Sequence, residues 1–239
     1  MSDTPSDRAV NGEATKPPLP QHDDVAIALR KFGPLGILSI LIILGGNFLF
    51  VPVSAVLVLI WTRLSNTPLR EIGYVRPKNW AATVIVGVAF GATLKFLLKA
   101  VVMPILGAPA INPAYHYLVG NTAALPAILY LVIVGAGFGE ETLFRGWMFE
   151  RLGKLLGSSL FAKTTTVLLT SIGFGLAHYA EQGLPGTEQA TIFGLLFGTI
   201  FAITNRIFML MIAHAAFDLT AVAIIYWNFE NTVAHWLFR

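Results

Sequence analysis

Long apolar runs, separated by short polar stretches, make up the chain from about residue 34 to residue 227. An apolar run of about 20 residues is typical of a membrane-spanning helix, because at 1.5 Å per residue such a helix crosses the hydrocarbon layer. After a first run at 34–61, the pattern predicts spans at about 80–106, 122–150, 164–180, 189–204 and 206–227. The predicted fold class is all-α: a polytopic transmembrane bundle of about six to seven spans.

The first apolar run, 34–61, is interrupted by the letters GGN and by Pro52. Its length fits one long tilted span, and it also fits a kinked or re-entrant pair of helices. Basic residues flank the run on both sides. A re-entrant pair would place both basic clusters on one side of the membrane, whereas a single span would separate them.

The polar stretches alternate in charge. Lys and Arg lie at 63–78, 151–163 and 206, whereas 107–121 and 180–189 contain neither. Since basic loops stay on the cytoplasmic side, the pattern from residue 62 onward places the first set inside and the second set outside.

The composition agrees with a membrane protein. Hydrophobic residues make up 55% of the chain and charged residues 12%, against about 25% charged in soluble domains. The absence of cysteine excludes a disulfide framework, a thiolate nucleophile and a Cys-based zinc site. No basic patch interleaved with aromatics indicates a nucleic-acid partner. Residues 1–32 are polar and predicted to be a disordered tail, which leaves 33–239 as the membrane-embedded domain.

Three polar clusters lie inside the predicted spans, where ionisable side chains are costly and usually functional. The first is Glu140-Glu141 with Arg145. On a helix Glu141 and Arg145 share a face and can form an ion pair, whereas Glu140 points about 100° away. A structural lock between helices explains Glu141 and Arg145 as well as a functional role does. Glu140 has no such partner within its helix.

The second cluster ends in His178, and the third pairs His214 with Asp218 four residues later. Either histidine alone is more simply explained by packing and a hydrogen bond to a carbonyl. Two histidines together with carboxylates inside one bundle supply what hydrolysis requires, a base for water and donors for an oxyanion.

In their order and spacing the three clusters resemble the motifs of the CPBP family over roughly residues 120–225. This family contains the type II CAAX prenyl endopeptidases and bacteriocin-processing or immunity proteins, and is also called the Abi family. The resemblance implies a hydrolase, an intramembrane protease of the CAAX-processing type, with its active site inside the bundle. It implies that Glu140 and His178 activate the attacking water.

The resemblance also assigns the other motif residues. His214 and Asp218 would stabilise the oxyanion, and Glu141 with Arg145 would orient the site. The family's third motif ends in Asn or Asp. An aspartate donates poorly to an oxyanion unless it is protonated or acts through His214.

The resemblance leaves the metal requirement open. Family members are commonly described as metalloproteases, and Glu140, His178 and His214 could supply a zinc site with one open position. The family is also described as a metal-free glutamate protease, and the chain lacks the His-Glu-x-x-His signature. The donor set therefore favours a mechanism that requires no cofactor over one that uses zinc.

Two other functions stay open. One is a non-catalytic immunity or scaffold protein of the same family. The other is a proton-coupled transporter with Glu140, His178 and His214 as a relay, which would predict repeated halves that the sequence lacks. The protease hypothesis predicts a protein or peptide substrate, with or without a lipid group, in contact with membrane lipid. It also predicts a multi-pass protein, of the inner membrane in a bacterium.

The predicted spans leave one geometric difficulty. Glu140 falls near the middle of its span, whereas His178 falls near the outer end of the span at 164–180. For the two to meet, that span must begin later or lie deeper than the charges indicate.

Overall fold

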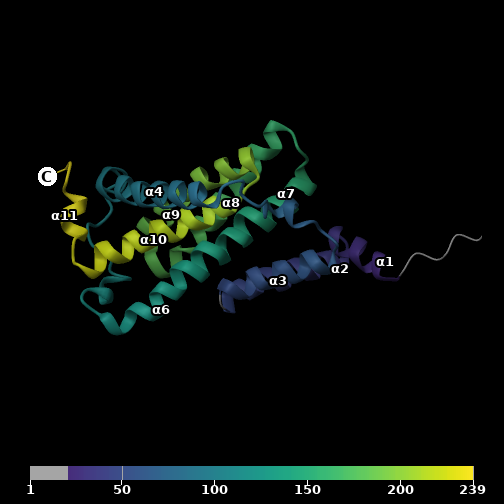
Figure 1. The fold of residues 1–239 in the computed structure, drawn as a ribbon, viewed down its shortest axis with the longest axis horizontal. Helices are drawn as coiled ribbons and strands as arrows, with labels where there is room; N and C mark the ends of the chain where they lie inside the picture. The colour runs from purple at the N-terminus through teal and green to yellow at the C-terminus, as the bar shows by residue number, and fades with distance from the viewer. Residues whose placement is uncertain (1–20, 50, 239) are drawn as a thin grey trace, which may run out of the picture.

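The structure is a computed structural model that describes residues 21–49 and 51–238, and in these residues it contains helices and no strands (Figure 1). Five of the helices are long and apolar enough to cross a membrane, or six if the bent pair Asp24–Arg30 and Pro34–Asn47 counts as one span. The predicted polytopic helical bundle is therefore confirmed.

The helical elements follow one another in this order: α1 Gln21–Arg30, α2 Pro34–Leu49, α3 Val51–Leu64, η1 Leu69–Ile72, α4 Trp80–Leu97, η2 Leu98–Val102, α5 Met103–Ile105, η3 His116–Leu118, η4 Thr122–Ala124, α6 Leu125–Tyr130, η5 Leu131–Trp147, α7 Met148–Leu156, α8 Leu160–Ala177, α9 Tyr179–Thr204, α10 Phe208–Tyr226 and α11 Glu230–Ala234. Three of them, α6, η5 and α7, form one continuous span, and its middle part, η5, is π-helical.

The first apolar run forms a pair of helices. The glycine at position 46 in α2 lies so close to α3 that a Cβ there would be 2.8 Å from Leu57 Cδ1. At the other end of the pair, the Arg30 guanidinium donates to the backbone carbonyl of Asn66. The two flanking basic clusters therefore lie at the same end, as the re-entrant alternative requires and a single span does not.

The predicted disordered tail at 1–32 differs from the structure over its last third. Residues 21–30 form α1, because Ala26 and Leu29 are buried, 4% and 7% exposed, and anchor the helix on the bundle. Residues 1–20 lie outside the described part of the chain.

Residues 180–189 do not form the predicted polar connection between two spans, because this segment is the first part of α9. The helix is broken at Gly183, which has φ 63° and ψ −160°, and Pro185 follows directly. Glycine adopts positive φ without strain, and proline lacks the N–H that a regular helix would use there. The span predicted at 189–204 therefore begins ten residues earlier, at Tyr179.

Helix α10 is the centre of the bundle, and two glycines let neighbouring helices approach it closely. A Cβ at Gly91 of α4 would lie 2.0 Å from the carbonyl oxygen of Ala213, and one at Gly137 of η5 would lie 2.9 Å from that of Met211. Only a residue without a side chain fits such contacts. The close approach of η5 brings the two glutamates against His214.

Candidate active site

Glu141 is the centre of a fully buried polar network. Its Oε1 accepts hydrogen bonds from Arg145 Nη1 at 2.9 Å and from His214 Nδ1 at 2.7 Å. The exposed fraction of its side chain is 0%, and that of Arg145 is 2%. The predicted ion pair between Glu141 and Arg145 is present. The bond to His214 was not predicted, and it joins the first motif to the third.

The Arg145 guanidinium is enclosed by aromatic rings. Its Cζ lies 4.4 Å from the centroid of Phe174, with Phe193 and Phe197 at 5.5 and 5.6 Å. Stacking of a cation on the negative face of a ring compensates part of its lost hydration. The arginine is thus held by one carboxylate and an aromatic cage.

His214 presents its other nitrogen to two further carboxylates. Because Glu141 accepts at Nδ1, that nitrogen carries a hydrogen, and Nε2 faces Glu140 and Asp218. Nε2 lies 3.7 Å from Glu140 Oε2 and 3.6 Å from Asp218 Oδ2. Both distances exceed a direct hydrogen bond, so the two carboxylates are near neighbours of Nε2 and not its hydrogen-bond acceptors. The imidazole orientation is therefore fixed by Glu141 rather than by Asp218.

Glu140 turns away from this network, as its position on the helix predicts. Its Oε2 is buried and has no hydrogen-bond partner among the described residues. Buried polar atoms nearly always have one. The Glu140 side chain lines a cavity, from which a small movement would let water or a substrate supply the missing donor.

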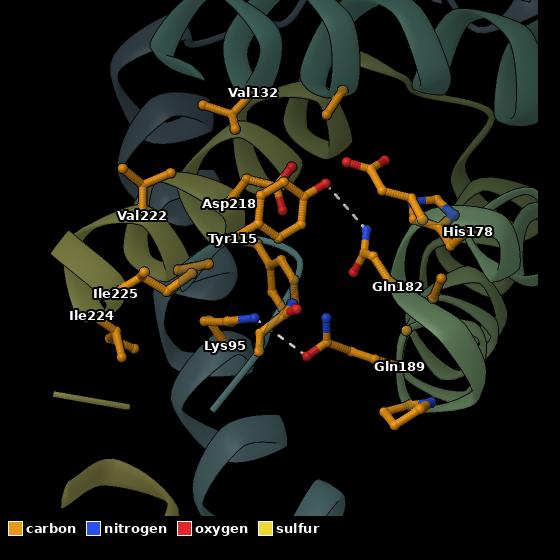
Figure 2. Close-up of a pocket in the computed structure, with 18 of the residues that line it drawn as sticks. Lys95, Tyr115, Val132, His178, Gln182, Gln189, Asp218, Val222, Ile224 and Ile225 are labelled. Atoms are coloured by element: carbon orange, nitrogen blue, oxygen red, sulfur yellow. Dashed lines mark hydrogen bonds between the residues drawn. The ribbon is translucent and has the colours of Figure 1, made fainter. Parts of the chain in front are cut away.

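His178 follows the last residue of α8 and lines the same cavity. Its Nδ1 lies 2.8 Å from the carbonyl oxygen of Phe174, which can only accept, so the hydrogen is on Nδ1 and Nε2 is left as an acceptor. Figure 2 shows this histidine on the wall opposite Asp218.

The cavity has a volume of about 510 Å³ and is lined by Glu140, His178, His214 and Asp218. Other polar residues of the lining were not predicted as site residues, among them Lys95, Tyr115, Gln182 and Gln189. The ammonium of Lys95 donates to Gln189 Oε1 at 3.2 Å, and Gln182 Nε2 donates to the hydroxyl of Tyr115 at 3.4 Å (Figure 2). Lys95 gave a signal in the sequence, as did Lys99 on the same cavity, because both are lysines within an apolar span.

Tyr115 is a neutral donor or acceptor at the cavity. Burial, and after it the neighbouring Glu181 carboxylate, raises the pKa of its phenol above the usual 10. The hydroxyl therefore keeps its proton at any physiological pH.

All six predicted site residues lie together, either lining the cavity or in the network behind it. The sequence had placed His178 too far from Glu140 along the membrane normal. In the structure both residues line the same cavity, and the broken first part of α9, which follows His178 directly, lines it as well. Glu140 lies beside His214, and it lines the same cavity as His178. The catalytic roles of the six residues stay predictions.

The zinc alternative is not supported. In the part of the chain that the structure describes, no three His, Cys, Asp or Glu side chains gather so that they could hold a metal ion.

Comparison with known proteins gives one match. Residues 122–220 match the family described as type II CAAX prenyl endopeptidase Rce1-like. The match contains all three motifs and confirms the resemblance drawn from them. Among curated proteins and among solved structures, no match was found.

Proposed function

We propose that this chain, a member of the Rce1-like family of type II CAAX prenyl endopeptidases, hydrolyses a peptide bond inside the membrane with a water molecule activated by Glu140. The family supports a CAAX-type intramembrane protease. The observation that carries the proposal is Glu140, which lines the cavity beside His214 and has a buried oxygen without a hydrogen-bond partner among the described residues.

The first chemical step is attack by water. Glu140 takes one proton from the water, and the water oxygen forms a bond to the carbonyl carbon of the substrate. His178 can accept a hydrogen bond from the same water at its free Nε2 and so orient it. A positioned general base contributes typically 10²- to 10⁴-fold to the rate.

The negative charge then develops on the carbonyl oxygen. His214 supplies the donor through Nε2 when this nitrogen carries a proton, since Glu141 holds Nδ1 and fixes the ring. Asp218 acts through His214 and not as a direct donor, because an ionised carboxylate only accepts hydrogen bonds. When the C–N bond breaks, the proton held by Glu140 passes to the leaving amine.

The test compares peptide termini, by mass spectrometry, in membranes that contain the wild type or Glu140→Gln. The amide keeps the shape of the side chain and removes the base, so we expect termini that appear with the wild type alone. Glu71→Gln is the matched control, because this carboxylate is 38% exposed, pairs with Lys154 and lies outside the cavity. Identical termini with equally abundant, folded wild type and Glu140→Gln would sink the protease proposal and favour a scaffold or immunity role.

A further inference from the structure

Lys95 is a buried cation on the wall of the cavity. It lies in α4, and its exposed fraction is 8%. The close approach of α4 to α10 determines its position, because a Cβ at Gly91 would lie 2.9 Å from the backbone nitrogen of Phe217, and Lys95 follows Gly91 by one turn on the same face. Its Nζ lies 4.7 Å from the centroid of the Phe217 ring. Since Phe217 directly precedes Asp218, the lysine is a neighbour of the third motif.

The hydrogen-bonding capacity of Lys95 is largely unused. An ammonium carries three donors, and among the described residues its one hydrogen-bond acceptor is Gln189 Oε1, at 3.2 Å. It forms no ion pair with a carboxylate of the described residues, Asp218 included. An ionisable group inside a membrane protein is costly and usually functional. Lys95 lies outside residues 122–220, so the match to the family assigns it no role.

The second lysine of the cavity differs, because it has a partner. Lys99 follows Lys95 by one turn, and its Nζ lies 3.4 Å from Glu230 Oε1 and donates to the carbonyl of Ala110. Glu230 in turn accepts a hydrogen bond from the backbone nitrogen of Asn112 at 2.9 Å. These contacts join η2, the loop before η3 and α11 into one wall. A peptide that reaches Lys95 therefore meets a closed wall one helical turn further on.

We propose that Lys95, with the side-chain amide of Gln189, binds the carboxyl terminus of the peptide that is cleaved. Figure 2 shows the two side chains pointing toward each other into the cavity. The carboxylates of Glu140, Asp218 and Glu181 also line it, so an anionic group is repelled there and attracted beside the lysine. A carboxylate held by an ammonium accepts a charge-assisted hydrogen bond, which is about twice as strong as a neutral one.

This inference rests on the proposed function and adds a substrate preference to it. A peptide whose free carboxyl terminus occupies Lys95 presents a bond close to that terminus to Glu140, because both residues line one cavity of about 510 Å³. Lys95 would thus select chains that are cut near their end over chains that are cut internally.

The test measures binding in a Glu140→Gln background, so that it does not depend on cleavage. The probe is a fluorescent, farnesylated CAAX peptide with a free carboxyl terminus, compared by fluorescence polarisation in detergent with the same peptide as its terminal amide. We expect the free acid to bind about 10- to 100-fold more tightly than the amide, the range of a hydrogen bond to a charged group. Lys95→Gln in this background should bring the ratio close to one, and Lys95→Arg should keep most of it.

Lys99→Gln is the matched control, because it removes the same charge from the same cavity but takes it from a lysine that Glu230 already neutralises. The ratio of the two affinities should stay as it is. Equal affinities for acid and amide would overturn the inference, and so would a ratio that survives Lys95→Gln or that Lys99→Gln abolishes as completely. If Lys95→Gln does not fold, Lys95→Met repeats the comparison without a polar group to bury.

A third peptide, amidated and with glutamate as its last residue, separates a terminal carboxylate from a side-chain carboxylate. We expect it to bind as weakly as the other amide. Binding as tight as that of the free acid, and lost in Lys95→Gln, would overturn the assignment to the carboxyl terminus.

A failure of the proposed function gives a different result. In that case no peptide terminus depends on the wild type, whereas the preference for the free acid and its loss in Lys95→Gln persist. Cleavage of the acid and the amide with equal kcat/KM would leave the protease proposal intact and remove this inference.

Discussion

Removal of the Glu141 carboxylate is expected to destabilise the protein strongly. Glu141→Leu removes the carboxylate that accepts a hydrogen bond from Arg145, whose side chain is 2% exposed. Breaking a buried ion pair on one side costs about 3–5 kcal/mol, because the remaining charge has neither water nor a partner. This corresponds to roughly two to four powers of ten in the unfolding equilibrium constant.

The double variant Glu141→Leu with Arg145→Met tests whether the loss of stability in Glu141→Leu comes from the unpaired arginine. Replacing both members of a buried pair by apolar residues of similar size is often neutral or stabilising. We therefore expect the double variant to be more stable than Glu141→Leu alone, although it removes one more native side chain. The aromatic rings that now stack on Arg145 would pack on the methionine instead.

The assay is unfolding in detergent, followed by tryptophan fluorescence against temperature or denaturant. Trp147 is 2% exposed and lies two residues after Arg145, so it reports on this region. Glu71→Gln is the control, since its exposed pair with Lys154 is worth about 0–1 kcal/mol. The reasoning would be refuted if the double variant were less stable than Glu141→Leu by the full cost of losing Arg145. An unchanged unfolding midpoint for Glu141→Leu would refute it as well.

Two further predictions concern packing and titration. Gly91→Ala would place a Cβ 2.0 Å from the carbonyl oxygen of Ala213 and is expected to lower the free energy of unfolding by about 1–3 kcal/mol. Gly173→Ala is the control, because no atom lies within 4 Å of the new Cβ, and it should be as stable as the wild type in the same unfolding assay. The raised pKa of Tyr115 predicts that the phenolate absorbance of wild type minus Tyr115→Phe shows no step near pH 10. Its contribution to stability is then complete below pH 10 and is lost as the pH rises through the higher folded value; a step at pH 10 in the folded protein would contradict this.

The sequence predicts the spans and the ionisable residues of the site well, because both depend on local properties. An apolar run must be about as long as the membrane is thick, and a carboxylate inside such a run stands out. The separation of Glu140 from Glu141 also follows from helix geometry, since adjacent side chains point in different directions. The structure bears this out, with one glutamate on the cavity and the other in the network.

The break in α9 could not be predicted in the same way. Residues 180–189 are polar and contain glycine and proline, which is the usual pattern of an exposed loop. In the protein part of this segment lines the cavity, where Gln182 and Gln189 have hydrogen-bond partners. Hydropathy cannot distinguish a segment that faces water outside from one that faces a polar cavity.

The sequence also did not predict which side chains of the site contact one another across different helices. The sequence did not predict that Glu141 holds His214 or that Glu140 lies beside the same histidine. Which side chains meet between helices depends on how closely the backbones approach, and here that depends on Gly137 and Gly91. A glycine marks that a close approach is allowed, but it does not identify the helix that makes it.

The adjacent glutamates have different roles, because Glu141 fixes the orientation of His214, the histidine that lies beside Glu140. Glu141, with Arg145, holds Nδ1 of His214, and this leaves Nε2 facing Glu140 and Asp218. Glu141→Gln keeps an acceptor but also brings an amide donor, so the imidazole can bind in either tautomer. If Glu141 is a positioning residue, this variant should lower kcat and change its pH profile while KM stays the same. A loss of stability without a change in the pH profile would limit Glu141 to a structural role.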